Sequence, residues 1–369
     1  MTRRVLHVLA PATYGGLERV VQSLASEQRA RGHEVHAAPI MELGEPEPPL
    51  LCLLRRDDVQ VHPIATPARA YLAQAHALNV ACRAIQPDVI HAHGYVADVL
   101  LAMSNRSRST PRVSTVHGFT GGGMKNRAYE WMQRRAFRRF DAVVAVSARL
   151  GRELVADGLR SDRVHVIANA FPVVTAAAGP SAARRALDIP EHSFSIGWVG
   201  RVSQEKGLDV LINALQALHG IDWRLTVLGD GRERQVLQRR VAELGLAERV
   251  SWRGAVANAS DLVRAFDVLV ISSRTEGTPM TLFEAMTASV PLVATAVGGI
   301  PDVVSSDEAL LVPADDPDAL ADAIRSVQQG AFAAGQRAAR AYIRLRRDYA
   351  IGPFVEAYDR VYDSLKPRE

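Results

Sequence analysis

The sequence predicts an α/β protein made of two domains, each a doubly wound parallel sheet with helices on both faces. Short apolar runs alternate with amphipathic stretches along the chain, and this alternation implies parallel strands joined by helices. The pattern occurs twice, on either side of a stretch rich in Ala, Pro and Ser at residues 169–193 that is typical of a linker. A length of 369 residues also fits two domains of ordinary size better than one.

Each apolar run is an expected strand, and most are followed by a helical pattern. In the first half the expected strands are residues 5–9, 34–38, 89–91, 112–116, 142–146 and 164–167. In the second half they are residues 195–199, 224–228, 250–252, 268–271, 291–294 and 309–312. Helical periodicity is clear at residues 16–31, 207–218 and 232–244, and we expect the last helix, around Phe354 and Tyr358, to return to the first domain.

Composition excludes several classes of protein. The chain is 48% hydrophobic and 23% charged, as in a globular protein. Cys52 and Cys82 are the only cysteines, which argues against a disulfide framework and a cysteine-built zinc site. The apolar run at residues 5–10 is short and followed by glycines, so it predicts a strand and not a signal peptide. The longest uncharged run, residues 285–301, contains prolines and glycines, so we expect no transmembrane helix and a cytoplasmic protein.

Charge is distributed unevenly between the halves. Residues 1–190 hold 24 basic and 16 acidic residues, whereas the remainder holds 20 and 24. A basic first half and a mildly acidic second half suggest different partners for each. No basic–aromatic recognition module accompanies the charge, so nucleic acid is not an expected partner.

Two segments of the second half are suited to binding a phosphorylated sugar. In "GWVGRVSQEKG", residues 197–207, a strand is followed by a glycine turn, Arg201 and Lys206, and cations beside a helix start favour phosphate. Two solvated cations on a loop would explain the same pattern. In "RTEGTPMTLFEAM", residues 274–286, Glu276 lies in a loop and Glu284 inside the helix that follows. Amides at that helix start could receive a diphosphate, and the two carboxylates could bind sugar hydroxyls. For Glu284, the alternative is an ordinary exposed helix residue.

Other motifs are weaker by themselves. The Gly-Asp-Gly turn at residues 229–231 lacks the glycine spacing of a dinucleotide site and is more simply a plain turn before a helix. His91 and His93 in "HAHG" could form a metal pair, but no third ligand is visible nearby in the sequence, so a structural or cleft-lining role is favoured. His117 ends a strand before a glycine, which favours a functional role, and His7 is expected to pack in the first sheet.

Taken together, the segments "GWVGRVSQEKG", "SSRTEGTPMTLFEAM" and "PLVATAVGGIPDVV" resemble the nucleotide-sugar half of retaining glycosyltransferases of family 4. "YGGLERVVQSLA", "VIHAHG", "TVHGF" and "VIANAF" extend the resemblance over nearly the whole chain. It implies the GT-B architecture, two Rossmann-like domains facing across a cleft. The implied division is an acceptor-binding domain at residues 1–172, a nucleotide-sugar-binding domain at 173–348, and a C-terminal helix at 349–369 returning to the first domain.

The resemblance implies roles for the charged residues that match the family motifs. Arg201 and Lys206 would bind the donor diphosphate, and Glu284 would hold the ribose hydroxyls. Glu276 would face the transferred sugar near its anomeric centre. His117 would lie beside that sugar or assist at the reaction centre. These roles make His117, Glu276, Arg201 and Lys206 the expected catalytic residues.

The remaining expected donor-binding positions act through the backbone or line the pocket. They are Gly15 and Gly16 in the first strand–helix loop, Arg253 and Gly254 near the base, Gly277 and Thr278 beside Glu276, and the amides of Leu282 and Phe283. Thr278 stands where family members often carry an aromatic residue or leucine, so the sugar pocket is expected to differ.

The family resemblance also implies the chemistry. A hexose would move from a nucleoside diphosphate sugar, with UDP or GDP as the nucleotide, to a glycan or lipid-linked acceptor with retention of configuration. Arg201, Lys206 and a helix N-terminus would neutralise the leaving diphosphate, so we expect no metal and no further cofactor. A nucleotide-sugar epimerase or a phosphorylase on the same scaffold, or a non-catalytic sugar-nucleotide binding protein, are the alternatives. The short chain favours a role in bacterial surface glycan synthesis.

Residues 125–140, "KNRAYEWMQRRAFRRF", predict a helix with a strongly basic face. Arginines 127, 134, 135, 138 and 139 fall within an arc of ~140° at 100° per residue, and Trp131 lies among them. Such a face suits anionic lipid headgroups at the inner face of a membrane. A surface helix whose arginines are merely solvated explains the pattern equally well, and both interpretations remain open.

Overall fold

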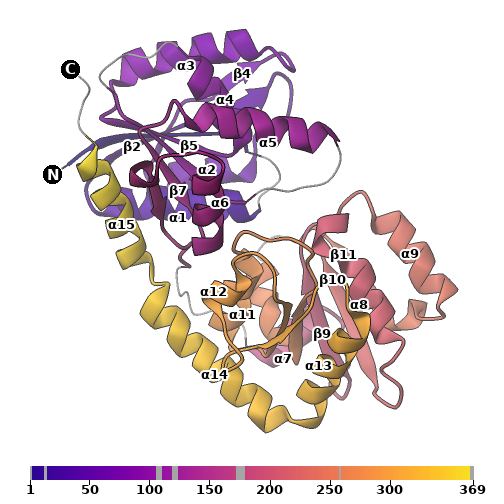
Figure 1. Ribbon diagram of the computed structural model, residues 1–369. Helices are drawn as coiled ribbons and strands as arrows, with labels where there is room; N and C mark the ends of the chain where they lie inside the picture. The colour runs from indigo at the N-terminus through magenta and orange to yellow at the C-terminus, as the bar shows by residue number, and fades with distance from the viewer. Residues whose placement is uncertain are drawn as a thin grey trace. The chain divides into compact units, whose positions relative to one another are not determined.

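The fold is that of a computed structural model, which describes residues 2–11, 15–104, 110–118, 124–171, 179–256 and 259–365, apart from the side chains of residues 124–126. The chain divides into two compact units (Figure 1). The first comprises Met1–Pro172 with Tyr349–Glu369, and the second comprises Val173–Asp348. The last helix, α15 (Ile351–Ser364), therefore belongs to the first unit although it follows the second in the chain.

The first unit is built on a parallel sheet with the spatial order β3-β2-β1-β5-β6-β7-β8, and β4 pairs with β2. Its strands are β1 (Arg4–Leu9), β2 (Glu34–Glu42), β3 (Gln60–Val61), β4 (Ile64–Thr66), β5 (Val89–His93), β6 (Arg112–Val116), β7 (Ala142–Ala145) and β8 (Val164–Val166). Its helices besides α15 are α1 (Gly16–Ala30), α2 (Pro49–Arg56), α3 (Tyr71–Ile85), α4 (Tyr95–Met103), α5 (Met124–Phe137), α6 (Ala148–Ala156) and the 3-10 turn η1 (Ser161–Arg163).

The second unit is built on a parallel sheet with the order β11-β10-β9-β12-β13-β14. Its strands are β9 (Phe194–Val199), β10 (Trp223–Leu228), β11 (Val250–Gly254), β12 (Val268–Ile271), β13 (Leu292–Thr295) and β14 (Leu310–Val312). Its α-helices are α7 (Pro180–Ala186), α8 (Leu208–Leu215), α9 (Arg234–Glu243), α10 (Ala259–Leu262), α11 (Met280–Ala288), α12 (Ile300–Val303), α13 (Pro317–Gln329) and α14 (Ala331–Asp348). The 3-10 turns are η2 (Gln204–Lys206), η3 (Ala247–Arg249) and η4 (Val263–Ala265).

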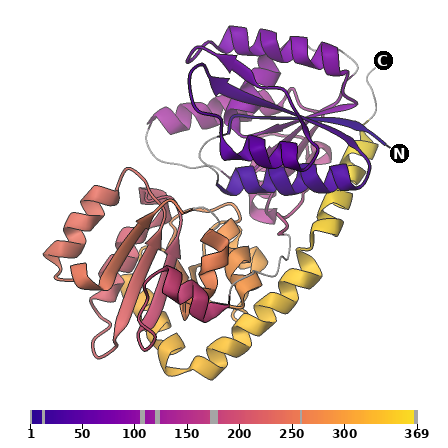
Figure 2. The same cartoon turned by 180° about the vertical axis from the view of Figure 1, so that it is seen from behind.

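Helices cover both faces of each sheet, as two opposite views show (Figure 1, Figure 2). This is why the central strands are almost continuously apolar: β12 is buried throughout, and β1 is buried after its first residue. Because all the strand pairs in these ladders are parallel, the loops that follow β9, β10, β12 and β13 gather at one edge of the second sheet. That edge is where a ligand site is expected in an open α/β sheet.

All twelve strands expected from the sequence are present, and the parallel doubly wound arrangement is confirmed. The sequence missed β3 and β4, which are two and three residues long and too short to show a pattern. The linker expected at residues 169–193 was wrong in part, because Pro180–Ala186 forms helix α7 with proline in its first turn. Residues 172–178 lie outside the described part of the chain.

Candidate active site

Lys206 and Glu276, 70 positions apart in the sequence, form an ion pair at the carboxyl edge of the second sheet. The Lys206 Nζ lies 2.6 Å from Glu276 Oε1, and the Ser273 hydroxyl donates to the same oxygen at 2.7 Å. The lysine side chain is 25% exposed and the glutamate side chain 7%. The structure thus joins the expected phosphate-binding cation directly to the expected sugar-binding acid.

Two glycines allow the loops that carry this pair to approach so closely. Gly207 follows Lys206 with φ +62°, and a Cβ there would overlap the carbonyl oxygen of Ser272. Gly298, with φ +57°, lies against the carbonyl oxygen of Glu276 in the same way. The Gly299 amide also donates to the Gly277 carbonyl at 2.7 Å. Both positions require glycine for backbone conformation and for space, so three strand-end loops pack as one body.

Arg201 extends from the loop between β9 and α8, and its side chain is 62% exposed. Its guanidinium lies 3.1 Å from Glu205 Oε1. Burial opposes ionisation of Glu205, but Ser203, the local backbone and the charges of Arg201 and Lys206 lower its pKa overall. Glu205 is therefore an anion that interacts with both cations, and Arg201 remains accessible to a ligand.

Helix α11 supplies the second glutamate. Glu284 is only 4% exposed, so the alternative of an ordinary exposed helix residue is excluded. The helix begins after Pro279 without a side-chain cap, and its Leu282 amide already donates to the Pro279 carbonyl at 3.1 Å. The Leu282 and Phe283 side chains are fully buried and Thr278 nearly so, which leaves the backbone of this turn as the available binding surface.

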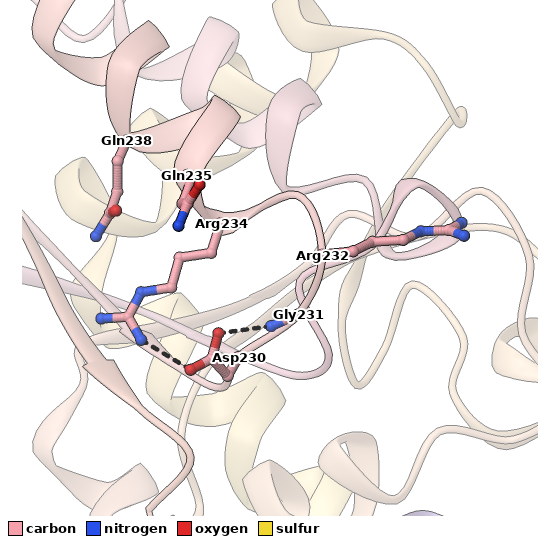
Figure 3. A pocket seen from close by; sticks show the side chains of 6 residues that line it. All are labelled: Asp230, Gly231, Arg232, Arg234, Gln235 and Gln238. Atoms are coloured by element: carbon pink, nitrogen blue, oxygen red, sulfur yellow. Dashed lines mark hydrogen bonds and ion pairs between the residues drawn. The ribbon is translucent and has the colours of Figure 1, made fainter.

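The Gly-Asp-Gly turn, read from the sequence as a plain turn, borders a cavity of about 520 Å³ (Figure 3). Its lining comes from the loop after β10 and the first turns of α9: Asp230, Gly231, Arg232, Arg234, Gln235 and Gln238. Figure 3 shows Arg234 facing Asp230, with the two atoms of their ion pair 2.9 Å apart, while Arg232 points away from them. The amide of Gly231 is held by Asp230 at 2.8 Å. The two glycines flanking Asp230 were the signal in the sequence for this pocket.

Arg253 and Gly254 differ in how they relate to this pocket. The Gly254 carbonyl accepts from the Gly229 amide at 2.7 Å, so it adjoins the turn. The Arg253 guanidinium instead bonds the Leu187 carbonyl and, at 3.0 Å, Asp188 Oδ2. The Arg253 side chain therefore binds the end of α7, and only the main chain of Arg253 is left to face the Gly-Asp-Gly turn.

In the first unit, Gly15 and Gly16 form the start of α1. The Gly15 amide donates to Glu18 Oε2 at 3.0 Å, which is the one bond of a capping box that a glycine N-cap allows. His117 follows β6, and burial lowers its pKa to about 4, so the ring is neutral at pH 7. The ring is partly exposed, but its Nε2 is enclosed and has no hydrogen-bond partner among the residues that the structure describes.

The structure adds a third residue, His7, to the pair His91 and His93. One nitrogen from each lies within 4.8 Å of the others, a spacing that could hold a metal ion. However, His7 bonds Gln28 at 2.8 Å and His93 at 3.0 Å, and His91 bonds Tyr362 and Thr115, each at 2.7 Å. Burial lowers the pKa of all three rings. We therefore interpret the cluster as a neutral hydrogen-bonded core, and the expected packing of His7 in the sheet is confirmed.

No helix in the described part of the chain is both long and apolar enough to cross a membrane. In α5, Trp131 is 63% exposed. Arg134 pairs with Asp157, and Arg139 donates to the Ala102 carbonyl at 2.6 Å, so neither belongs to a free basic face. The side chain of Lys125 lies outside the described residues. The exposed face is therefore narrower than the sequence suggested.

Comparison with known proteins agrees with these features. Residues 14–173 match the family described as Glycosyltransferase Family 4, and residues 193–329 match the one described as Glycosyl transferases group 1. The chain is similar to the lipopolysaccharide core biosynthesis mannosyltransferase LpsB of Rhizobium meliloti, with 30% identity over 62% of this chain and 67% of that protein. It is also similar to a D-inositol 3-phosphate glycosyltransferase of Xylanimonas cellulosilytica, with 30% identity over 73% of this chain and 71% of that protein.

Among solved structures, Anabaena Alr3699/HepE in complex with UDP-glucose superposes with a TM-score of 0.86. The match has 21% identity and covers 98% of this chain and 100% of that one, which establishes a common fold. The fold class is therefore GT-B, with two Rossmann-like units. The family matches and the two relatives extend this likeness to activity, and the chain belongs to the group 1, family 4 glycosyltransferases.

Proposed function

We propose that this glycosyltransferase moves a hexose from a nucleoside diphosphate sugar to an acceptor, with retention of anomeric configuration, in bacterial surface glycan or glycolipid synthesis. The second unit would bind the donor and the first the acceptor. The observation that carries the proposal is the Lys206–Glu276 pair at 2.6 Å, held at the carboxyl edge beside the start of α11. A cation for the diphosphate and an acid for the sugar hydroxyls are thereby placed side by side.

The chemical problem is the charge that the leaving diphosphate gains as the glycosidic bond breaks. Lys206 and the exposed Arg201 can neutralise it, together with the positive end of the helix dipole of α11. These groups would act in place of a metal ion. The departing phosphate oxygen would accept the proton of the acceptor hydroxyl on the same face of the sugar. His117, neutral at pH 7, would bind a sugar hydroxyl without adding charge at the reaction centre.

Two similarities support the donor and the setting. HepE was crystallised with UDP-glucose, and LpsB is described as a mannosyltransferase of lipopolysaccharide core biosynthesis. The cavity beside Asp230 follows the end of β10, the strand that pairs with β9, and a nucleotide base could lie in this cavity. We therefore propose UDP or GDP as the nucleotide and a glycan or lipid-linked sugar as the acceptor.

A thermal-shift screen against nucleotide sugars identifies the donor, and site variants then test the assignment. Lys206→Ala and Arg201→Ala should each lower turnover by about 10²–10³-fold, the usual loss for one charge-stabilising contact. Circular dichroism should show an unchanged fold, because both side chains belong to the loop after β9 and not to the hydrophobic core. Full activity in both variants would refute the donor site. Conversion of the donor alone to its epimer would instead identify a nucleotide-sugar epimerase.

The first unit also offers a candidate membrane contact on and just after α5. Arg127, Trp131, Arg135 and Arg138 are all exposed, and their spacing places them on one helical stripe. A tryptophan among arginines suits the headgroup region of an anionic bilayer. This stripe would bring a lipid-linked acceptor close to the enzyme.

Flotation with liposomes tests this contact. The wild type should float with vesicles containing anionic lipid at low salt and not with neutral vesicles. Replacing Arg127, Arg135 and Arg138 by Gln should abolish flotation. The same change at Arg149, Arg152 and Arg160 removes equal charge from another exposed part of the unit and should leave flotation intact. Equal loss in both triple variants would show nonspecific charge attraction only.

A further inference from the structure

We propose that Arg274 is a positioning residue of the donor site, which holds the turn that carries Lys206 in register with the loop that carries Glu276. The proposal rests on the proposed function, since it concerns how the cation and the acid of that site are aligned. Arg274 stands two residues before Glu276, and its links join its own loop to the loops that follow β9 and β14 of the second unit.

The first links run to the turn η2, which ends in Lys206. The main-chain amide of Arg274 donates to the Glu205 carbonyl at 2.8 Å. Its side-chain Nη1 donates to the Gln204 carbonyl at 2.7 Å. Two consecutive carbonyls of the turn are therefore bonded by a single residue of the other loop. Displacing Arg274 would free both of these carbonyls at once.

The second links fix the guanidinium itself. Asp209, in the first turn of α8, accepts from Nη1 at 2.8 Å and from Nη2 at 2.7 Å, in the forked geometry that a planar guanidinium favours. Asp315, between β14 and α13, accepts from Nε at 2.6 Å. The hydrogen bond to Asp209 outweighs burial and raises the pKa of Arg274. With its charge balanced by two carboxylates, Arg274 serves as an anchor, and Lys206 and Arg201 remain the cations for phosphate.

The backbone conformation at Asp315 favours aspartate at the outer anchor. Asp315 has φ +56°, a left-handed conformation uncommon for residues other than glycine. Aspartate tolerates this region better than most side chains, and here it also supplies the carboxylate. Its side chain is 60% exposed and pairs with Arg274.

Arg184 provides a matched control at the opposite edge of the same sheet. Its guanidinium lies 3.2 Å from Asp267 Oδ2 and donates to the Ser193 carbonyl at 2.6 Å. It therefore clamps the amino ends of β9 and β12 as Arg274 clamps the loops after their carboxyl ends. Loss of either arginine removes an ion pair and loop contacts from the second unit, but only Arg274 contacts the Lys206 turn.

The test measures binding of UDP, and of GDP in parallel, by calorimetry to the full chain. Arg274→Gln should weaken binding about tenfold, within the range for coupled neighbours. Arg274→Lys, which keeps the charge without the fork, should lie between it and the wild type. Arg184→Gln should lower the melting temperature and leave the affinity unchanged. In a Lys206→Gln background, adding Arg274→Gln should cause no further loss, because Arg274 acts through Lys206.

The outcomes separate the two levels of the proposal. If the wild type binds nucleotide and Arg274→Gln binds it with the same affinity, the positioning role is wrong while the donor site stands. The same conclusion follows if Arg274→Gln weakens binding by the same factor in the Lys206→Gln background as in the wild type. If the wild type binds neither UDP nor GDP, the proposed function fails and the positioning role falls with it. Should Arg274→Gln fail to fold, the same comparisons are made with Arg274→Lys, for which wild-type affinity would overturn the proposal.

Discussion

The two parallel sheets place their polar side chains differently. In the first unit, His7, His91 and Thr115 lie within strands and are fully buried, and Tyr358 and Tyr362 of α15 reach the same network. In the second unit, buried polar positions within the strands hold small hydroxyl side chains such as Ser195 and Thr226. The Lys206–Glu276 ion pair of that unit lies instead in two strand-end loops.

We therefore expect polar side chains to have different roles in the two units: stability in the first and ligand binding in the second. A buried hydrogen-bond network stabilises one arrangement only while every member is satisfied, so it ties the first sheet to the C-terminal helix. Charges in strand-end loops contribute little to the core, but they remain within reach of a ligand. Changes in the second unit's loops should therefore alter turnover, whereas changes in the first unit's network should alter stability and its dependence on pH.

The largest expected effect is at Glu276. Glu276→Gln leaves Lys206 without its partner, but that side chain is 25% exposed and can be hydrated, so the melting temperature should change little. Turnover of the donor identified by thermal shift should fall by at least about 10²-fold, because the proposed contact to the sugar is weakened. A large fall in the melting temperature of Glu276→Gln with unchanged turnover would show that this loop charge serves stability and not turnover, the opposite of what we expect for the second unit.

The next effect concerns Asp98, a carboxylate buried under the first sheet. Burial raises its pKa to about 7, although Ser114 and Gln133 donate to it at 2.6 and 2.7 Å. A raised acid pKa gives a contribution to stability that is complete below the unfolded pKa of 3.8 and is lost as pH rises towards 7. The free energy of unfolding of Asp98→Asn, relative to that of the wild type, should therefore rise by about 2–3 kcal/mol when the pH is raised from 5 to 8.

Urea unfolding of both proteins at these two pH values measures the difference. The comparison isolates Asp98, because the buried histidines act equally in both proteins. Their pKa values are lowered, so each destabilises the fold as pH falls below 6.5. Parallel pH profiles for Asp98→Asn and the wild type would show that Asp98 does not titrate in this range.

The smallest effect is expected at Tyr362. Its hydroxyl lies 2.7 Å from His91 Nδ1 and 3.4 Å from Gln28 Nε2, both buried. Tyr362→Phe keeps the ring but leaves these groups without that partner, which should destabilise the protein by about 1–2 kcal/mol. Turnover under native conditions should be unchanged. Loss of turnover without loss of stability would mean that the network serves catalysis as well as packing.

The sequence predicted most of the fold because alternating apolar and amphipathic runs are a local property. It missed β3 and β4, which pair with a neighbour over only two and three residues and have no pattern of their own. It assigned residues 180–186 to a linker, since alanine and proline are common both in linkers and in first helical turns. The candidate residues of the donor site were named mainly through a family resemblance, with glycine turns and helix starts as physical support.

The sequence by itself determined the two-domain plan, the strand order along the chain and the types of charged residue in each loop, because spacing and side-chain chemistry are written in the chain. Only the tertiary structure decided which groups meet. It joined Lys206 to Glu276, placed Arg274 between Asp209 and Asp315, and brought His7 beside His91 and His93. The physical reason is that parallel crossovers align the ends of strands that are distant in sequence, and no local pattern records that alignment.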